Sequence, residues 1–272
     1  MAITAKVVTI TPKMAREYLS TNRHNRKLRT KVVEFFAQQM ALGEWKSNGE
    51  TIIFDYNGDL KDGQHRLEAI VLSKKPQEMV VVEGVSPKVM DTIDTGRIRG
   101  LGDVLELNSI KNYNHMAALV RRIFKYEDGR YNKDRKEIQF LSNNRGLDYV
   151  LENHDRLQGI ISLSLSIAGK TKILNVTQIG FYLYVINGLK EATNEPKTFL
   201  KRLAGIERVE GTASAYVSNI IDNAKRKKTP LNKKWVLGLV IKAWNLHVSG
   251  DPIIRSLTYS VDADLPEVEK IN

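Results

Sequence analysis

The sequence predicts an α+β protein in two parts, a mixed α/β domain over residues 1–102 and an all-α, basic domain over residues 103–272. Two observations predict this division. Up to about residue 100, β-branched apolar runs alternate with amphipathic helical patterns. From about residue 102 onward, apolar residues recur at helical spacing and strand candidates become few. The hydrophobic share of 42% in 272 residues is enough for a sizeable buried core.

The first domain is expected to begin with a strand at 6–10, which is rich in β-branched residues. Thr11-Pro12 is typical of a helix start, with threonine as the cap and proline in the first turn. A second amphipathic helix is predicted at about 28–42, with Gly43 ending it. The remaining predicted elements are a strand at 51–54, a return strand from Leu60, a helix over 64–73, a strand at 79–83 and a helix from Ser86-Pro87.

The hairpin between the two middle strands contains Tyr56-Asn57-Gly58-Asp59. Asn-Gly tolerates positive φ at both central positions, so a type I′ turn is expected there. The second domain is predicted as helices at 103–108, 111–127, 134–143, 147–153, 155–169, 176–193, 196–205, 212–225 and 232–247, followed by an irregular tail from Gly250.

Composition excludes several classes of function. The chain has no cysteine, which removes disulfides, thiolate metal sites and cysteine nucleophiles. No pair among its five histidines has the spacing of metal ligands on a helix. No apolar run approaches the roughly 20 residues that span a bilayer, and the start lacks the layout of a signal peptide. We expect a cytoplasmic protein with no membrane association.

The positive charge is concentrated in the second part of the chain. Residues 1–110 hold 16 basic and 14 acidic groups, a net charge of +2, whereas residues 111–272 hold 26 and 17, a net charge of +9. Such an excess favours an anionic polymer through long-range attraction and counterion release. DNA is therefore the expected partner, and a basic surface that only aids solubility is the alternative.

The segment Asp62-Gly63-Gln64-His65-Arg66 is the most informative motif. A strand delivers the chain to Gly63, which permits a tight turn, and a helix begins at once. The first N–H groups of a helix and its positive dipole end form an anion site. Arg66 adds a permanent cation, His65 a group that transfers protons near neutral pH, and Asp62 a ligand for Mg²⁺ or a base. The alternative is a plain hairpin followed by an exposed helix start.

This motif resembles the DGQHR signature of the ParB/sulfiredoxin superfamily, where ParB proteins have Gly-Glu-Arg-Arg and sulfiredoxin Gly-Cys-His-Arg. The resemblance spans residues 1–105 through the order of elements and through Asn25-Arg26, Gly43-Glu44-Trp45 and Asp94-Thr95-Gly96-Arg97, which resemble companion motifs of phage- and plasmid-borne relatives. It implies a ParB/sulfiredoxin-like domain that binds a nucleoside triphosphate, ATP or CTP, with Mg²⁺. Because Gln64 stands where sulfiredoxin has its cysteine, sulfinic acid reduction is excluded.

The resemblance and the chemistry of the residues together give the candidate site. Asp62, His65 and Asp94 are the candidate catalytic residues, and Asp62 and Asp94 the candidate metal ligands. The candidate nucleotide-binding residues are Gly63, Gln64, His65, Arg66, Asn25, Arg26 and Arg97. The candidate nucleic-acid contacts are Arg23, Lys27, Arg29, Lys225, Arg226, Lys227 and Lys228.

Three functions remain open at the level of sequence. The first is an enzyme that hydrolyses a nucleoside triphosphate, cleaves nucleic acid or transfers a phosphoryl group, with DNA as its substrate or companion. The second is a DNA-binding adaptor whose nucleotide only switches its conformation or its assembly, for example into a homodimer. The third is a partner-binding protein that keeps the fold with an idle pocket.

Overall fold

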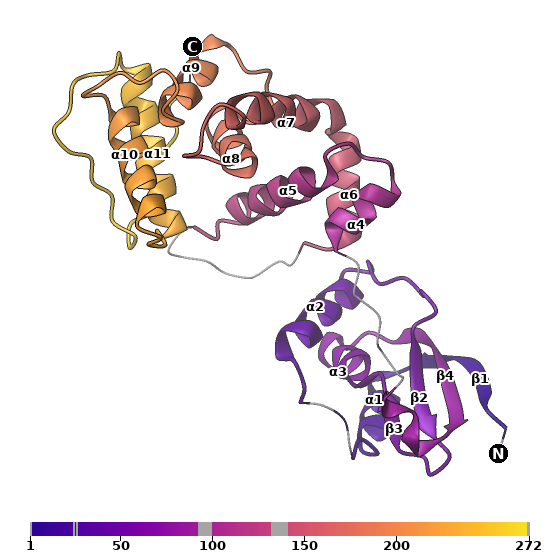
Figure 1. Ribbon diagram of the computed structural model, residues 1–272. Helices are drawn as coiled ribbons and strands as arrows, with labels where there is room; N and C mark the ends of the chain where they lie inside the picture. The colour runs from indigo at the N-terminus through magenta and orange to yellow at the C-terminus, as the bar shows by residue number, and fades with distance from the viewer. Residues whose placement is uncertain (1, 24, 26, 92–99, 132–140, 271–272) are drawn as a thin grey trace. The chain divides into compact units, whose positions relative to one another are not determined.

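The computed structural model describes residues 2–23, 25, 27–91, 100–131 and 141–270 (Figure 1). The chain is a mixed α+β protein whose described residues form one four-stranded sheet and the helices α1–α11. It divides into two compact units, residues 1–98 and 99–272, which we call unit 1 and unit 2. The sequence had placed this boundary four residues later. None of the described helices is both long and apolar enough to cross a bilayer.

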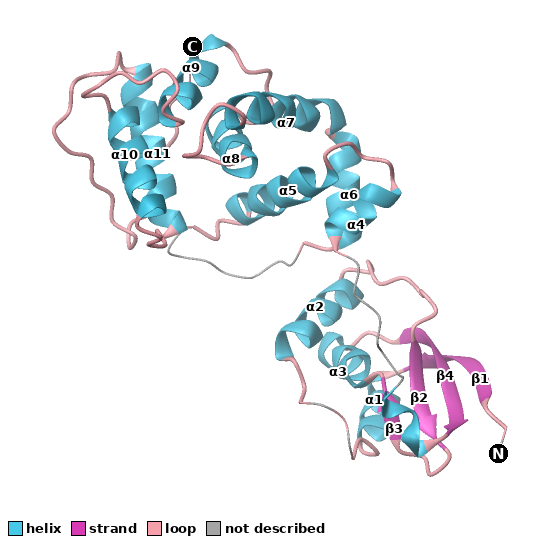
Figure 2. Cartoon of the chain, viewed as in Figure 1, coloured by secondary structure: helices cyan, strands magenta, loops and turns pink. Residues whose placement is uncertain are grey.

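The sheet of unit 1 has the strand order β1-β4-β2-β3 (Figure 2). Strand β4 (Gln77–Val85) pairs antiparallel with β1 (Thr4–Ile10) and parallel with β2 (Thr51–Asp55), and β3 (Leu60–Asp62) pairs antiparallel with β2. The parallel pair needs a crossover connection, and the hairpin arm β3 with helix α3 provides it. The sheet thereby fixes where the chain enters α3.

Three helices pack against the sheet of unit 1, α1 (Pro12–Leu19), α2 (Thr30–Ala41) and α3 (Gln64–Ser73). α1 and α3 begin where the sequence predicted, whereas α2 begins two residues later and ends one residue earlier than predicted. The Thr11 hydroxyl accepts from the N–H of Met14 at the start of α1, and Gly43 has a φ of 71° just after α2. The buried apolar residues between helices and sheet are Ile10, Ala15, Val33, Ala37, Met40, Ile52, Phe54, Leu60, Leu67, Ala69, Ile70, Met79 and Val81.

The hairpin turn differs from the expected type I′. Gly58 has a positive φ of 84°, but Asn57 does not. The Asp55 carboxylate explains the difference, because its Oδ1 accepts from the N–H groups of Asn57 at 2.8 Å and Asp59 at 3.0 Å. Its Oδ2 lies 2.9 Å from Nζ of Lys61, and both side chains are buried. A buried ion pair therefore sets the turn in place of the Asn-Gly geometry.

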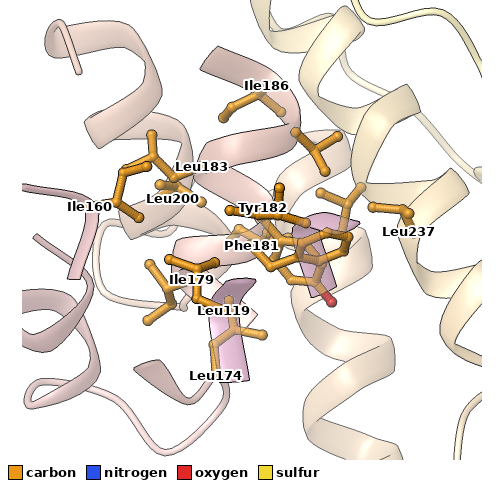
Figure 3. Packing of buried hydrophobic residues seen from close by; sticks show 14 of the residues in the cluster. Leu119, Ile160, Leu174, Ile179, Phe181, Tyr182, Leu183, Ile186, Leu200 and Leu237 are labelled. Atoms are coloured by element: carbon orange, nitrogen blue, oxygen red, sulfur yellow. The ribbon is translucent and has the colours of Figure 1, made fainter. Parts of the chain in front are cut away.

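Unit 2 is helical and has one core of its own (Figures 1 and 3). Its helices are α4 (Leu101–Leu107), α5 (Tyr113–Glu127), α6 (Asn143–Glu152), α7 (His154–Ala168), α8 (Val176–Asn187), α9 (Asn194–Leu203), α10 (Ala213–Arg226) and α11 (Lys233–Val248). The core is centred on α8, whose Phe181, Tyr182 and Leu183 are all buried (Figure 3).

Two helix predictions in unit 2 need correction. The helix expected at 147–153 begins at Asn143, because the Ser142 hydroxyl caps it by accepting from the N–H of Arg145 at 3.1 Å. The helix expected to reach residue 193 ends at Asn187, where Gly188 takes a φ of 64°. The helix expected at 134–143 falls mostly outside the described residues.

Candidate anion site at the start of α3

Gly63 shapes the connection between β3 and α3. It has a φ of 101°, a conformation that side chains with a Cβ rarely adopt. A Cβ at this position would also collide with Cδ1 of Ile52 on the neighbouring strand. Both constraints require glycine. The turn delivers Gln64 as the first residue of α3, and no side chain caps that helix.

Helix α2 begins beside the first turn of α3. The backbone N–H of Arg29, the residue that precedes α2, donates to Nε2 of His65 at 3.0 Å. At the other end of the same two helices, the hydroxyl of Ser73 of α3 donates to Sδ of Met40 of α2 at 4.0 Å. Contacts at both ends show that the two helices run parallel, side by side.

This parallel arrangement brings two positive helix ends together. Neither α2 nor α3 has a side-chain cap, and neither has an acidic residue in its first turn. Each helix start carries a partial positive charge from its unsatisfied N–H groups. Two such starts beside each other repel, so an anion placed between them would be favoured by both.

Gln64 and His65 hold the segment that connects α1 with α2. Oε1 of Gln64 accepts from Nδ2 of Asn22 at 3.1 Å. Asn25 extends this contact, since its Nδ2 donates to Oδ1 of Asn22 at 2.7 Å and to the carbonyl oxygen of Leu60 at 2.8 Å. The side chains of Gln64 and His65 are buried, with 5% and 9% exposure. Their contacts therefore hold Asn22 and Arg29 at the start of α3.

The bond to Arg29 also fixes the chemical form of His65. A ring nitrogen that accepts a hydrogen bond carries a lone pair, so Nε2 is unprotonated in this arrangement. His65 therefore supports the architecture of the site through Nε2.

Arg66 joins the motif to the start of β2. Its Nη2 donates to the carbonyl oxygen of Thr51 at 2.6 Å and to Oδ2 of Asp62 at 2.8 Å. Its Nη1 donates to Oε2 of Glu50 at 3.0 Å. The side chain is only 12% exposed. The charges of Arg66 and Asp62 largely offset each other, and this pairing engages Oδ2 of the carboxylate that was expected to hold Mg²⁺.

The other predicted residues lie as follows. Nε of Arg23 is 3.4 Å from Oδ1 of Asp59, so this residue is held at the hairpin turn. Lys27 and Arg29 are exposed at the start of α2. Arg26, Asp94 and Arg97 lie outside the described residues. Among the residues that the structure describes, no three His, Asp or Glu side chains gather as a metal site.

The basic cluster of unit 2 lies at the end of α10. Nζ of Lys225 donates to the carbonyl oxygen of Lys172 at 2.5 Å, and Arg226 pairs with Asp222 at 2.7 Å. All four residues 225–228 are exposed. They form a solvent-facing basic end of a helix, as a contact with a nucleic-acid backbone would require.

No local motif in the sequence indicates the ion pair between Asp55 and Lys61. Burial alone would raise the pKa of Asp55, yet the Lys61 ammonium and the two backbone N–H groups outweigh it and lower that pKa below 3.8. A cavity of about 600 Å³ opens beside this hairpin, lined by Tyr18, Phe54 and Tyr56 among others. The one signal that could have suggested this ion pair is a charged residue in each strand of the hairpin, Asp55 in β2 and Lys61 in β3.

Comparison with known proteins returns no match, since no family model, no curated protein and no solved structure resembles the chain. The resemblance to the ParB/sulfiredoxin superfamily accordingly depends on the motif and on the elements around it.

Proposed function

We propose that unit 1 binds a nucleoside triphosphate through its phosphates at the start of α3, and that unit 2 contacts DNA. A ParB/sulfiredoxin-like architecture of unit 1 is part of this proposal. The observation that carries it is the pair of parallel helices α2 and α3, whose uncapped starts meet where Arg29 contacts His65. The exposed cations Lys27 and Arg29 stand at the same place.

Electrostatics favours a phosphate at this position. Backbone N–H groups and the dipoles of two helices act on the same anion, and each helix start typically contributes about 0.3–1 kcal/mol when exposed. Basic residues at a helix start are unfavourable to the dipole, so Lys27, Arg29 and Lys31 cost free energy unless an anion binds there. Gly63 supports the proposal further, because it lets the backbone approach a ligand closely.

The geometry supports binding better than turnover. Asp62 is paired with Arg66, and Nε2 of His65 is engaged by Arg29. Oδ2 of Asp62 and Nε2 of His65 would have to leave these partners before acting as base or metal ligand. Of the functions consistent with the sequence, a nucleotide-responsive DNA-binding adaptor is therefore favoured, with Mg²⁺ arriving on the nucleotide. Since the motif holds Asn22 and Arg29, a phosphate at α3 would act directly on these two residues of the connection between α1 and α2.

The experiment is a calorimetric titration of the full chain with ATP, CTP and GTP in the presence of Mg²⁺, with phosphate release measured in parallel, with and without duplex DNA. The proposal expects saturable binding of at least one nucleotide with no turnover. Turnover that depends on Asp62 would favour the enzyme instead. Absence of binding by all three nucleotides would refute the nucleotide site.

A further inference from the structure

A second feature of the molecule lies wholly within unit 2. A cavity of about 370 Å³ opens between α5, α8, α10 and α11. Its floor is apolar and aromatic, formed by the buried side chains of Tyr131, Phe181 and Tyr182. Figure 3 shows the last two in the buried cluster, near Leu237 of α11. This volume is in the range of cavities that bind small molecules.

The rim of this cavity is strongly basic. Arg122 and Lys125 come from α5, Lys225 from the end of α10 and Lys233 from the start of α11. None of the described residues that line the cavity is acidic. Arg122, Lys225 and Lys233 raise the potential of this small cavity, and an anion there would lower the repulsion between them.

The cations are positioned by the aromatic floor and by backbone. The guanidinium of Arg122 lies 5.9 Å from the ring centre of Phe181, and Nζ of Lys125 lies 5.3 Å from that of Tyr131. Nζ of Lys225 is held by the carbonyl oxygen of Lys172. Arg122 and Lys125 thus lie over ring faces, and the apolar side chains of Ile173, Ile221 and Val236 complete the lining that a ligand would meet.

We propose that this cavity binds a small phosphate-bearing molecule with a planar ring, of the class of a nucleoside monophosphate. Arg122, Lys225 and Lys233 hold the phosphate, and the ring packs against the aromatic and aliphatic side chains that line the cavity. The recessed aromatic floor favours a small ligand over a DNA backbone, which would meet only the rim. This site is separate from the one in unit 1 and does not depend on it.

The test uses AMP as the probe, with adenosine and inorganic phosphate as its two halves, in calorimetric titrations of the full chain. AMP is expected to bind at least about tenfold more tightly than either half, because rim and floor act together. Equal affinity for AMP and adenosine would overturn the anion site. Equal affinity for AMP and phosphate would overturn the role of the floor. No AMP binding would overturn the proposal.

Variants locate the site. Arg122→Gln with Lys233→Gln should weaken AMP binding at least about tenfold, whereas Lys170→Gln with Arg255→Gln removes the same charge from exposed positions elsewhere in unit 2 and should leave it unchanged. Circular dichroism and the thermal midpoint check that both proteins fold. Equal losses of AMP affinity in the two double variants would overturn the proposal. So would an Arg122→Gln, Lys233→Gln protein that loses affinity for duplex DNA and keeps its affinity for AMP. Lys31→Glu, in unit 1, should not affect AMP binding, which separates this result from failure of the nucleotide site.

Discussion

The backbone N–H of Arg29 donates to Nε2 of His65 at 3.0 Å, which links residues 36 positions apart and joins the starts of two helices. His65 belongs to the motif that the sequence singled out, and Arg29 to the basic segment in front of α2. The contact makes one site of two features that were separate in the sequence. It also gives His65 an architectural role that can be tested by substitution.

His65→Ala should lower the free energy of unfolding by about 1–3 kcal/mol, because the N–H of Arg29 loses its acceptor and a buried volume is left empty. Hydrogen exchange should increase at residues 27–30 before the rest of unit 1 is affected. His65→Gln, which offers an acceptor oxygen at similar reach, should retain most of the protection. Equal protection in the alanine variant and the wild type would show that the contact does not order the segment.

Gly63→Ala should destabilise unit 1 by about 2–4 kcal/mol, the sum of a left-handed conformation and a collision with Ile52. Gly43→Ala is the matched control, because Gly43 also has a positive φ but no atom near the added Cβ. Its cost should be about 1–2 kcal/mol. Urea unfolding of both variants measures the difference, and equal costs would contradict the close approach of Gly63 to β2.

The buried pair of Asp55 and Lys61 makes stability depend on pH at the acid end. Because the folded pKa of Asp55 is lowered, its contribution is complete above 3.8 and is lost as the pH falls through the folded pKa. Asp55→Asn should flatten this part of the stability profile, measured by urea unfolding between pH 2 and pH 6. An unchanged profile in the variant would exclude Asp55 as its source.

Removing one partner of this pair should cost more than removing a surface charge. Lys61→Met leaves the Asp55 carboxylate buried without its cation, and a loss of about 3–5 kcal/mol is expected. Lys6→Met, which breaks an exposed pair with Glu83, should cost less than about 1 kcal/mol. Similar losses in the two variants would contradict the burial of the pair.

The expected DNA contact of unit 2 should weaken steeply with salt. For a double-stranded site, the slope of log affinity against log salt gives the number of phosphates contacted. Lys227→Gln with Lys228→Gln should reduce that slope by about 1–2 and weaken binding to unrelated sequences equally, since the basic end of α10 meets the backbone. A fluorescence anisotropy titration measures it, and affinity that is flat across salt would exclude backbone contact.

Local signals in the sequence predicted the entry to α3 correctly. The turn at Gly63 and the helix bounds 64–73 depend on residues close together in the sequence, so local patterns could predict them. The type I′ turn was wrong because the Asp55 carboxylate binds the turn N–H groups, and its burial beside Lys61 is set by packing. The same limit applies to Gln64 and His65. Their partners Asn22 and Arg29 lie 42 and 36 residues away, so the sequence offered no sign of these contacts.

The neighbouring starts of α2 and α3 predict that one substitution both stabilises the free protein and weakens its binding of a nucleotide. Lys31→Glu places an acidic residue in the exposed first turn of α2, where it should stabilise the free protein by about 0.3–1 kcal/mol. Lys75→Glu makes the same charge change just beyond the end of α3 and should not stabilise it. Thermal unfolding without nucleotide compares the two, and a destabilised Lys31→Glu protein would contradict the unfavourable charge at this site.

The most direct measurement is the nucleotide affinity of the same two variants. The full chain, Lys31→Glu and Lys75→Glu are titrated calorimetrically with whichever of ATP, CTP or GTP the wild type binds most tightly, with Mg²⁺ present. A phosphate between the two helix starts predicts that Lys31→Glu binds at least about tenfold more weakly, while Lys75→Glu stays within about twofold of the wild type. Equal affinity of all three proteins, or no binding by the wild type, would contradict a phosphate site at the start of α3.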